Sequence, residues 1–107
     1  MEMPTISELN LLHANICQAL GDPKRILILY AIHDEPRHVT ALANSLGFPQ
    51  PTVSRHLRIL LQRALVRKER IGPAVVYHLA DQRIVEILEN MRLVLRDSMS
   101  RQANALA

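Results

Sequence analysis

The sequence predicts a small, mainly α-helical domain with a single β-hairpin (an α+β fold), and three observations lead to this class. Most of the chain repeats apolar residues at helical spacing, whereas residues 65–79 follow the pattern of two short strands. Hydrophobic residues make up 49% of the chain and aromatic residues only 3%, so the core is aliphatic, which suits packed helices. The length of 107 residues fits one domain, residues 1–107.

The first two helices are expected over about residues 7–20 and 23–33. Apolar side chains recur at helical spacing in the first, which should stop at Gly21, a residue that tolerates a left-handed conformation. Asp22 should cap the second helix, with Pro23 in its first turn, where the missing amide hydrogen has no consequence. The side chains expected to be buried in the second helix are Ile26, Leu27, Leu29 and Tyr30.

Two short helices joined at Gly47 are expected next, over about residues 40–46 and 50–63. Pro51 fixes the backbone in the first turn of the second of these helices. Leu42, Ala43 and Leu46 should point inward from the first. The buried stripe of the second should contain Val53, Leu57, Ile59 or Leu60, and Leu61, leaving a polar outer face. This arrangement is typical of a helix-turn-helix.

Residues 65–79 should then form a hairpin, with strands at 65–71 and 75–79 and a turn at 72–74. A last helix is expected over about residues 81–99, capped by Asp81, and a frayed tail over 101–107. Helices followed by a basic hairpin indicate a winged helix-turn-helix, in which the hairpin is the wing.

The polar face of the fourth helix carries the candidate contacts to double-stranded DNA. Gln50 and Arg55 are suited to reading base edges, since glutamine matches adenine and arginine matches guanine. Thr52, Ser54 and Arg58 are better suited to phosphate contacts. The hairpin would lie along the DNA backbone or in a minor groove through Arg67, Lys68 and Arg70.

Charge and motif content bear on the competing classes of function. The net charge is only +3, but basic residues concentrate in the middle of the chain, as on a polyanion-binding surface. The sequence has no phosphate-binding glycine loop, nucleophile motif or paired acid and base set, which argues against an enzyme. The alternative is a winged-helix module that binds another protein and not DNA.

Three stretches resemble the ArsR/SmtB family of bacterial repressors. They are Ala-Leu-Gly-Asp-Pro-Lys-Arg at 19–25, Pro-Gln-Pro-Thr-Val-Ser-Arg-His-Leu at 49–57, and the strand sequences at 65–66 and 76–79. The resemblance implies a winged-helix homodimer, formed by the first and last helices, that blocks transcription until a signal releases it from its operator. Two positions depart from the family pattern: Pro49 replaces a capping serine, and Ala64 replaces a common glycine.

The apolar pattern of the terminal helices independently favours a homodimer. The stripe on the last helix continues to Met99, farther than a small domain is expected to cover by itself. Two subunits would place their recognition helices about one DNA turn apart, so a near-palindromic operator is expected. The candidate interface residues are Leu9, Leu12, Ile16, Ile84, Leu88, Met91 and Leu95.

No metal site or cofactor is expected, and the effector is left unknown. The zinc positions of the family correspond to Asp81, Arg83, Val94 and Asp97, and arginine and valine cannot coordinate zinc. The cysteine pair of arsenic and cadmium sensors is replaced by the sequence at 38–40. His13, Cys17 and His38 are weak metal candidates, because a buried structural thiol is the commoner role of a cysteine beside an apolar stripe. His56 is expected to support helix packing or contact a phosphate.

The sequence also predicts a soluble, cytoplasmic protein that does not associate with membranes. Cys17 is the only cysteine, so an intrachain disulfide is impossible. The first residues, Met-Glu-Met-Pro, lack the basic and apolar regions of a signal peptide. The apolar runs fall short of the roughly 20 residues that a membrane-spanning helix needs.

Overall fold

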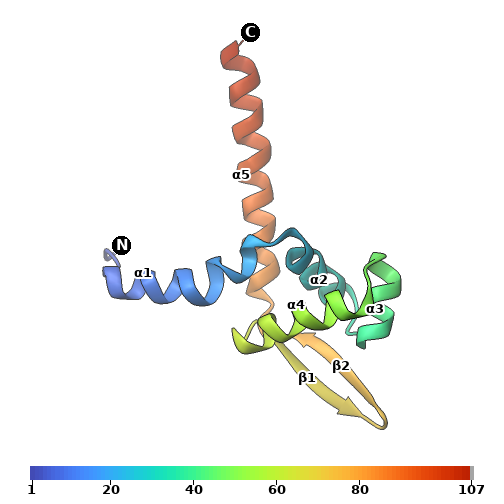
Figure 1. The fold of residues 1–107 in the computed structure, drawn as a ribbon. Helices are drawn as coiled ribbons and strands as arrows, with labels where there is room; N and C mark the ends of the chain where they lie inside the picture. Colours follow the sequence, from blue (N-terminus) through green and yellow to red (C-terminus); the bar gives the residue numbers. More distant parts are fainter. Residues whose placement is uncertain (107) are drawn as a thin grey trace.

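The computed structural model describes residues 1–106 and shows a helical body with a two-stranded wing (Figure 1). The predicted fold class, a mainly α winged helix-turn-helix, is confirmed. In chain order the elements are α1 (Ile6–Leu12), a π-helical turn η1 (His13–Cys17), a 3-10 turn η2 (Ala19–Gly21), α2 (Pro23–Asp34), α3 (Val39–Leu46), α4 (Gln50–Gln62), β1 (Val66–Ile71), β2 (Ala74–Leu79) and α5 (Arg83–Leu106).

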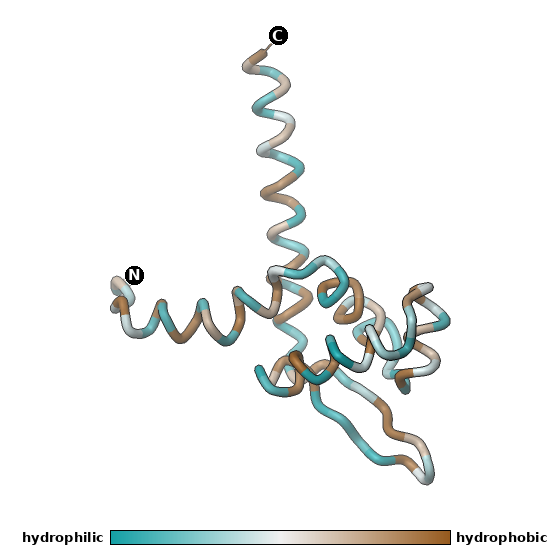
Figure 2. The backbone as a smooth tube through the Cα atoms, in the orientation of Figure 1, coloured by the Kyte–Doolittle hydropathy of each residue, from teal (hydrophilic) through white to brown (hydrophobic). Residues whose placement is uncertain are grey.

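Helices α2, α3 and α4, the base of the wing and the first turns of α5 enclose one aliphatic core. In contrast, α1 and most of α5 project from this body in different directions (Figure 1). Brown apolar and teal polar turns alternate along both projecting helices (Figure 2). Among residues 1–106, no helix is long and apolar enough to pass through a membrane.

The N-terminal helical segment is less regular than the continuous helix expected over residues 7–20. Within η1 the side chain of Asn15 donates a hydrogen bond of 2.8 Å to the carbonyl of Leu11. The amide of Gln18 bonds to the carbonyl of His13, five residues earlier, at 2.9 Å. A side-chain amide that competes for a helix carbonyl in this way favours a local departure from α-helical geometry.

Helix α2 begins as predicted but buries a different face. The Asp22 carboxylate accepts a hydrogen bond from the amide of Lys24 at 2.8 Å, and Pro23 stands in the first turn. The fully buried residues are Ile28, Leu29 and Ile32. The prediction that Leu27 is buried is wrong, since it is 45% exposed, and Ile26 and Tyr30 are half-buried. Packing against α3, α4 and β2 selects this face, which the sequence pattern alone does not identify.

The helix-turn-helix follows its predicted geometry closely. Gly47 takes a left-handed conformation with φ of 72°, and its amide bonds to the carbonyl of Ala43 at 2.9 Å. This residue ends α3 and turns the chain toward α4. Val53, Leu57 and Leu60 form the buried stripe of α4, while Ile59 and Leu61 are half-buried.

The wing pairs β1 with β2 antiparallel, with Val66 opposite Leu79 and Ile71 opposite Ala74. Two backbone hydrogen bonds between Arg37 and Tyr77, of 2.8 and 3.4 Å, attach β2 to the segment between α2 and α3. The wing is thus joined to the body at its base, and its tip extends away (Figure 1).

Helix α5 is longer than predicted. Its start agrees with the expected cap, because Asp81 accepts a hydrogen bond from the amide of Arg83 at 2.9 Å. The expectation of a frayed tail is wrong for residues 101–106, which continue the helix; Ala107 lies outside the described residues. No helix-ending glycine or proline occurs after position 83, so the helical hydrogen bonds continue.

Candidate nucleic-acid interface

Helix α4 presents its predicted polar face on the outside of the molecule. Gln50, Arg55 and Arg58 are exposed, and Thr52 and Ser54 are half-buried. The hydroxyl of Thr40, on α3, donates a hydrogen bond of 3.3 Å to the side-chain oxygen of Gln50. The amide nitrogen of Gln50 remains available as a donor, so a side chain suited to an adenine edge stands at the N-terminal end of α4.

The wing adds exposed positive charge beside this face. Lys68 and Arg70 share one face of β1, whereas Arg67 and Glu69 share the other. Glu69 partly neutralises its own face, since its carboxylate lies 3.9 Å from Arg67 Nη1 and 3.1 Å from His78 Nε2.

Several cations of the interface have no carboxylate nearby. In the part of the chain that the structure describes, no carboxylate lies within 4.0 Å of the charged nitrogens of Arg55, Arg58, Lys68 or Arg70. Uncompensated cations on two neighbouring elements form a surface that attracts a polyanion.

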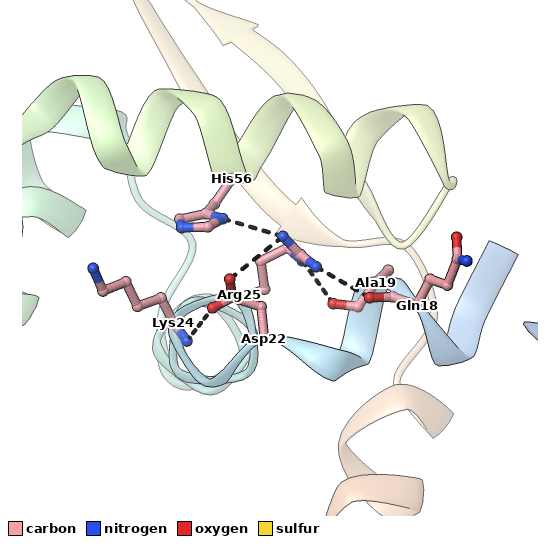
Figure 3. Close-up of polar contacts among 6 residues, drawn as sticks. All are labelled: Gln18, Ala19, Asp22, Lys24, Arg25 and His56. Carbon is pink, nitrogen blue, oxygen red and sulfur yellow. Dashed lines mark hydrogen bonds and ion pairs between the residues drawn. The ribbon is translucent and has the colours of Figure 1, made fainter. Parts of the chain in front are cut away.

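The inner side of α4 carries a polar cluster that sequence reasoning missed (Figure 3). His56 is only 4% exposed, and its Nδ1 lies 3.4 Å from Nη1 of Arg25, which reaches it from α2. Arg25 also pairs with Asp22 at 3.7 Å. The expectation that His56 supports helix packing is thereby met. Only the spacing of Asp22 and Arg25 hinted at the cluster, because Arg25 and His56 lie 31 residues apart in the sequence.

Electrostatics in this cluster favour a neutral imidazole. Burial lowers the pKa of His56 below its usual value, Asp22 opposes this effect, and the cations of Arg25, Arg55 and Lys24 add to it. Burial alone would raise the pKa of Asp22. The hydrogen bond from the Lys24 amide and the charges of His56 and Arg25 have a larger combined effect, so this pKa lies below its usual value.

The three weak metal candidates do not come together. His13 and Cys17 are exposed in η1, so the expectation of a buried thiol is wrong: Cys17 faces outward from a segment that projects from the body. His38 instead caps α3, because its Nδ1 accepts a hydrogen bond from the amide of Ala41 at 3.2 Å. Within residues 1–106, no group of three or more histidine, cysteine or acidic side chains is placed to hold a metal ion.

The Asp81 carboxylate, at a zinc position of the family pattern, is already engaged. Arg83 Nη2 donates to its Oδ2 at 2.7 Å and Arg83 Nε to its Oδ1 at 3.1 Å. The side-chain and backbone hydrogen bonds from Arg83 lower the pKa of Asp81 to about 2. This carboxylate therefore serves the start of α5.

The candidate dimer residues divide into two sets. Ile84 and Leu88 lie in the core of the subunit and are only 6% and 3% exposed, so they have little surface to offer a partner. Ile16 is half-buried against the same core. The exposed set is Leu9, Leu12, Met91 and Leu95. Exposed apolar side chains also occur nearby at Leu11, Ile87, Val94 and Met99.

The fold and the exposed face of α4 define a winged helix-turn-helix regulatory protein. Residues 22–68 match the family described as "Bacterial regulatory protein, arsR family". The chain is 35% identical over 77 residues to the HTH-type transcriptional regulator MJ1325 of Methanocaldococcus jannaschii, covering 71% of this chain and 86% of that protein. The chain belongs to the arsR family. Membership confirms the predicted class of a regulatory protein.

A second relative agrees with this assignment, and a solved structure shares the fold. The chain is 38% identical over 76 residues to the HTH-type transcriptional regulator NmtR of Mycobacterium tuberculosis, covering 71% of this chain and 63% of that protein. It thus matches less than two thirds of NmtR. The fold resembles the homodimeric winged helix-turn-helix DNA-binding domain of Mb0332 from Mycobacterium bovis, with a TM-score of 0.77, 24% identity, and coverage of 94% of this chain and 95% of that chain.

Proposed function

We propose that this protein is a sequence-specific DNA-binding transcription regulator, acting as a homodimeric repressor that an unidentified signal releases from its operator. The observation that carries the proposal is the exposed face of α4. There Gln50, Arg55 and Arg58 stand free of carboxylate partners within the described residues, beside a cationic wing. A buried or acid-neutralised face would not serve a DNA reader.

Each side chain has a distinct role in this proposal. Gln50 and Arg55 contact base edges in the major groove, where each supplies a bidentate match. Thr52, Ser54 and Arg58 contact phosphates and hold the register of α4 on the duplex. Among the wing residues, Lys68 and Arg70 contribute more attraction to the DNA backbone than Arg67 does, since Glu69 lies near Arg67.

The proposed dimer uses the helices that project from the body. Leu9 and Leu12 of α1, with Met91 and Leu95 of α5, leave apolar surface exposed on the single subunit. Exposed apolar patches of this kind are typical of association surfaces. A two-fold dimer presents two copies of α4, which reach half-sites about one DNA turn apart in a near-palindromic operator.

The test begins with selection of bound duplexes from a random pool, followed by fluorescence anisotropy on the selected site and on a scrambled duplex. We expect tighter binding to the selected site and a linear decrease of log affinity with log salt. Binding that is independent of salt, or absent, would instead favour the protein-interaction module. A reporter gene controlled by the selected site then distinguishes repression from activation.

Two substitutions separate base reading from backbone attraction. Arg55→Ala should weaken operator binding by about 1–3 kcal/mol and relax the preference at one base position, whereas Lys68→Ala should weaken all duplexes alike and flatten the salt slope. Arg96→Ala, on the projecting part of α5, is the matched control. It should change neither the affinity for DNA nor the salt slope. Equal loss of binding to selected and scrambled DNA in Arg55→Ala would refute direct reading by this residue.

A further inference from the structure

Arg25 lies where three segments of the chain meet (Figure 3). Its Nε donates a hydrogen bond of 2.7 Å to the carbonyl of Ala19, and its Nη2 donates one of 3.0 Å to the carbonyl of Gln18. The side chain is 13% exposed. Carbonyls at the end of a helical segment have few amide donors from a following turn, and the guanidinium supplies a donor to Ala19. The carbonyl of Gln18 accepts from the guanidinium and also from the amide of Gly21, at 3.2 Å.

The same guanidinium reaches the recognition helix α4. Its Nη1 lies 3.4 Å from Nδ1 of His56 and 3.7 Å from the carboxylate of Asp22. Arginine offers donors and no acceptor, so Nδ1 of His56 accepts in this contact and the imidazole carries its proton on Nε2. One side chain therefore joins the end of the N-terminal helical segment to the inner face of α4.

The N-terminal segment has few other attachments to the body. Helix α1 has no buried residue, and its contacts are mainly with η1, the next turns of the same helical segment, which in turn contacts η2. Burial begins at the junction, where Ala19 enters the core and Ile16 and Leu20 are half-buried against it. The direction in which α1 leaves the body is therefore set at residues 18–21, where Arg25 bonds.

We propose that Arg25 is a positioning residue that fixes the angle between the N-terminal helical segment and α4. This inference rests on the proposed function: with α1 held in the dimer, that angle sets how the two copies of α4 face DNA. Lysine cannot replace arginine here, because a single ammonium group cannot bond two carbonyls and an imidazole in fork geometry.

The first measurement needs no DNA. Spin labels at Glu8→Cys on α1 and Gln62→Cys on α4, in a Cys17→Ser background diluted with unlabelled protein, report the distance within one subunit. We expect a narrow distribution with Arg25 present and a shifted or broadened one in Arg25→Lys. Arg92→Lys is the matched control: Arg92 bonds Glu89 and lies over the ring of Tyr30, away from this junction.

The second measurement uses the unlabelled variants and the selected operator. Arg25→Lys should lose about tenfold or more in affinity for the operator while retaining its affinity for scrambled DNA, because the cationic surface is unchanged and only the placement of α4 is altered. It should also accept operators whose half-sites are spaced one or two base pairs differently. A residue that merely stabilises the fold would not relax this spacing preference.

His56 supplies a second pair of variants, should Arg25→Lys fail to fold. The side-chain oxygen of asparagine can replace Nδ1 as an acceptor, so His56→Asn should keep the distance distribution and the spacing preference. His56→Leu removes the acceptor and should alter both.

The distances and affinities together decide the inference. An unchanged distance in folded Arg25→Lys or in His56→Leu overturns the inference, as does an altered distance with unchanged operator affinity. If the parent protein does not discriminate its selected site, the proposed function fails, while the distances still decide whether Arg25 sets the angle.

Discussion

The two halves of α5 carry the same apolar stripe but lie in different surroundings. In the first half, Ile84, Val85 and Leu88 are buried in the subunit core. Farther along, Met91 and Leu95 continue the spacing but are 52% and 60% exposed. The helix passes beyond the body shortly after Leu88, and Figure 1 shows the remainder projecting freely.

This difference shows what helical periodicity does and does not determine. An apolar stripe identifies the face that needs covering, whereas the covering element depends on how far the rest of the chain reaches. For the first half of α5, α2 and the base of the wing supply the cover. For the second half, we propose that another subunit supplies it. The two halves should therefore respond differently to substitution.

The largest effect is expected at the buried half. Leu88→Ala should lower the free energy of unfolding by about 2–5 kcal/mol, because it removes buried methyl groups and leaves a cavity. Denaturant unfolding at low protein concentration, where subunits are dissociated, provides the measurement. Leu95→Ala is the matched control and should have little effect under the same conditions. Similar losses for both substitutions would mean that the two halves are equally supported within one subunit.

The exposed half should instead control association. Met91→Glu should raise the dissociation constant of the dimer by about 10-fold to 100-fold, because an unpaired carboxylate would be buried at the interface. Sedimentation over a concentration series measures the change. Asn104→Glu places the same charge on the same helix away from the stripe and should leave association unchanged. An unaltered sedimentation profile for Met91→Glu would contradict the proposed seam.

The helix-turn-helix and the wing were predictable because local chemistry specifies them. Asp22 and Pro23 mark the start of α2, and Gly47 supplies the left-handed residue that the turn requires. The polar face of α4 followed from the same periodicity as its buried stripe. Such signals lie within a few residues of the structure they specify.

Features that depend on distant segments were not predictable in this way. The burial of Ile28 in place of Leu27 depends on how α3, α4 and β2 approach α2. The contact between Arg25 and His56 joins positions 31 residues apart, and nothing in either local pattern identifies the partner. Residues 101–106 were expected to fray because chain ends often do, whereas they continue α5.

A smaller effect is expected at the link between α4 and the wing. Ala64 has φ of 59°, a left-handed conformation that a side chain disfavours, at the position where the family pattern has glycine. Ala64→Gly should therefore stabilise the protein by about 1 kcal/mol in denaturant unfolding. Ala80→Gly, at an exposed alanine without positive φ, should not stabilise it. A loss of stability in Ala64→Gly would show that this conformation is not strained.

The smallest effect concerns pH and again contrasts the body with the projecting helices. Burial holds the pKa of His56 below 6.5, its usual value; Asp22 opposes this effect, and Arg25, Arg55 and Lys24 add to it. As pH falls below 6.5, the unfolded chain binds a proton at this histidine before the folded protein does. The neutral imidazole therefore contributes stability that is complete above that pH and is lost as pH falls toward the lowered pKa of the folded state.

Unfolding free energies measured between about pH 7.5 and about pH 5.5 test this expectation, because most carboxylates keep their charge over this range. His56→Asn should reduce the decline in stability on the acid side. His13→Asn, which removes an exposed histidine from the N-terminal segment, should leave that decline in place. Parallel profiles for the parent protein and His56→Asn would show that the ring takes up its proton equally well in the folded and unfolded states. The polar cluster would then accommodate an imidazolium beside Arg25, and since both nitrogens of an imidazolium carry protons, Nδ1 could no longer accept a hydrogen bond from Arg25 in that state.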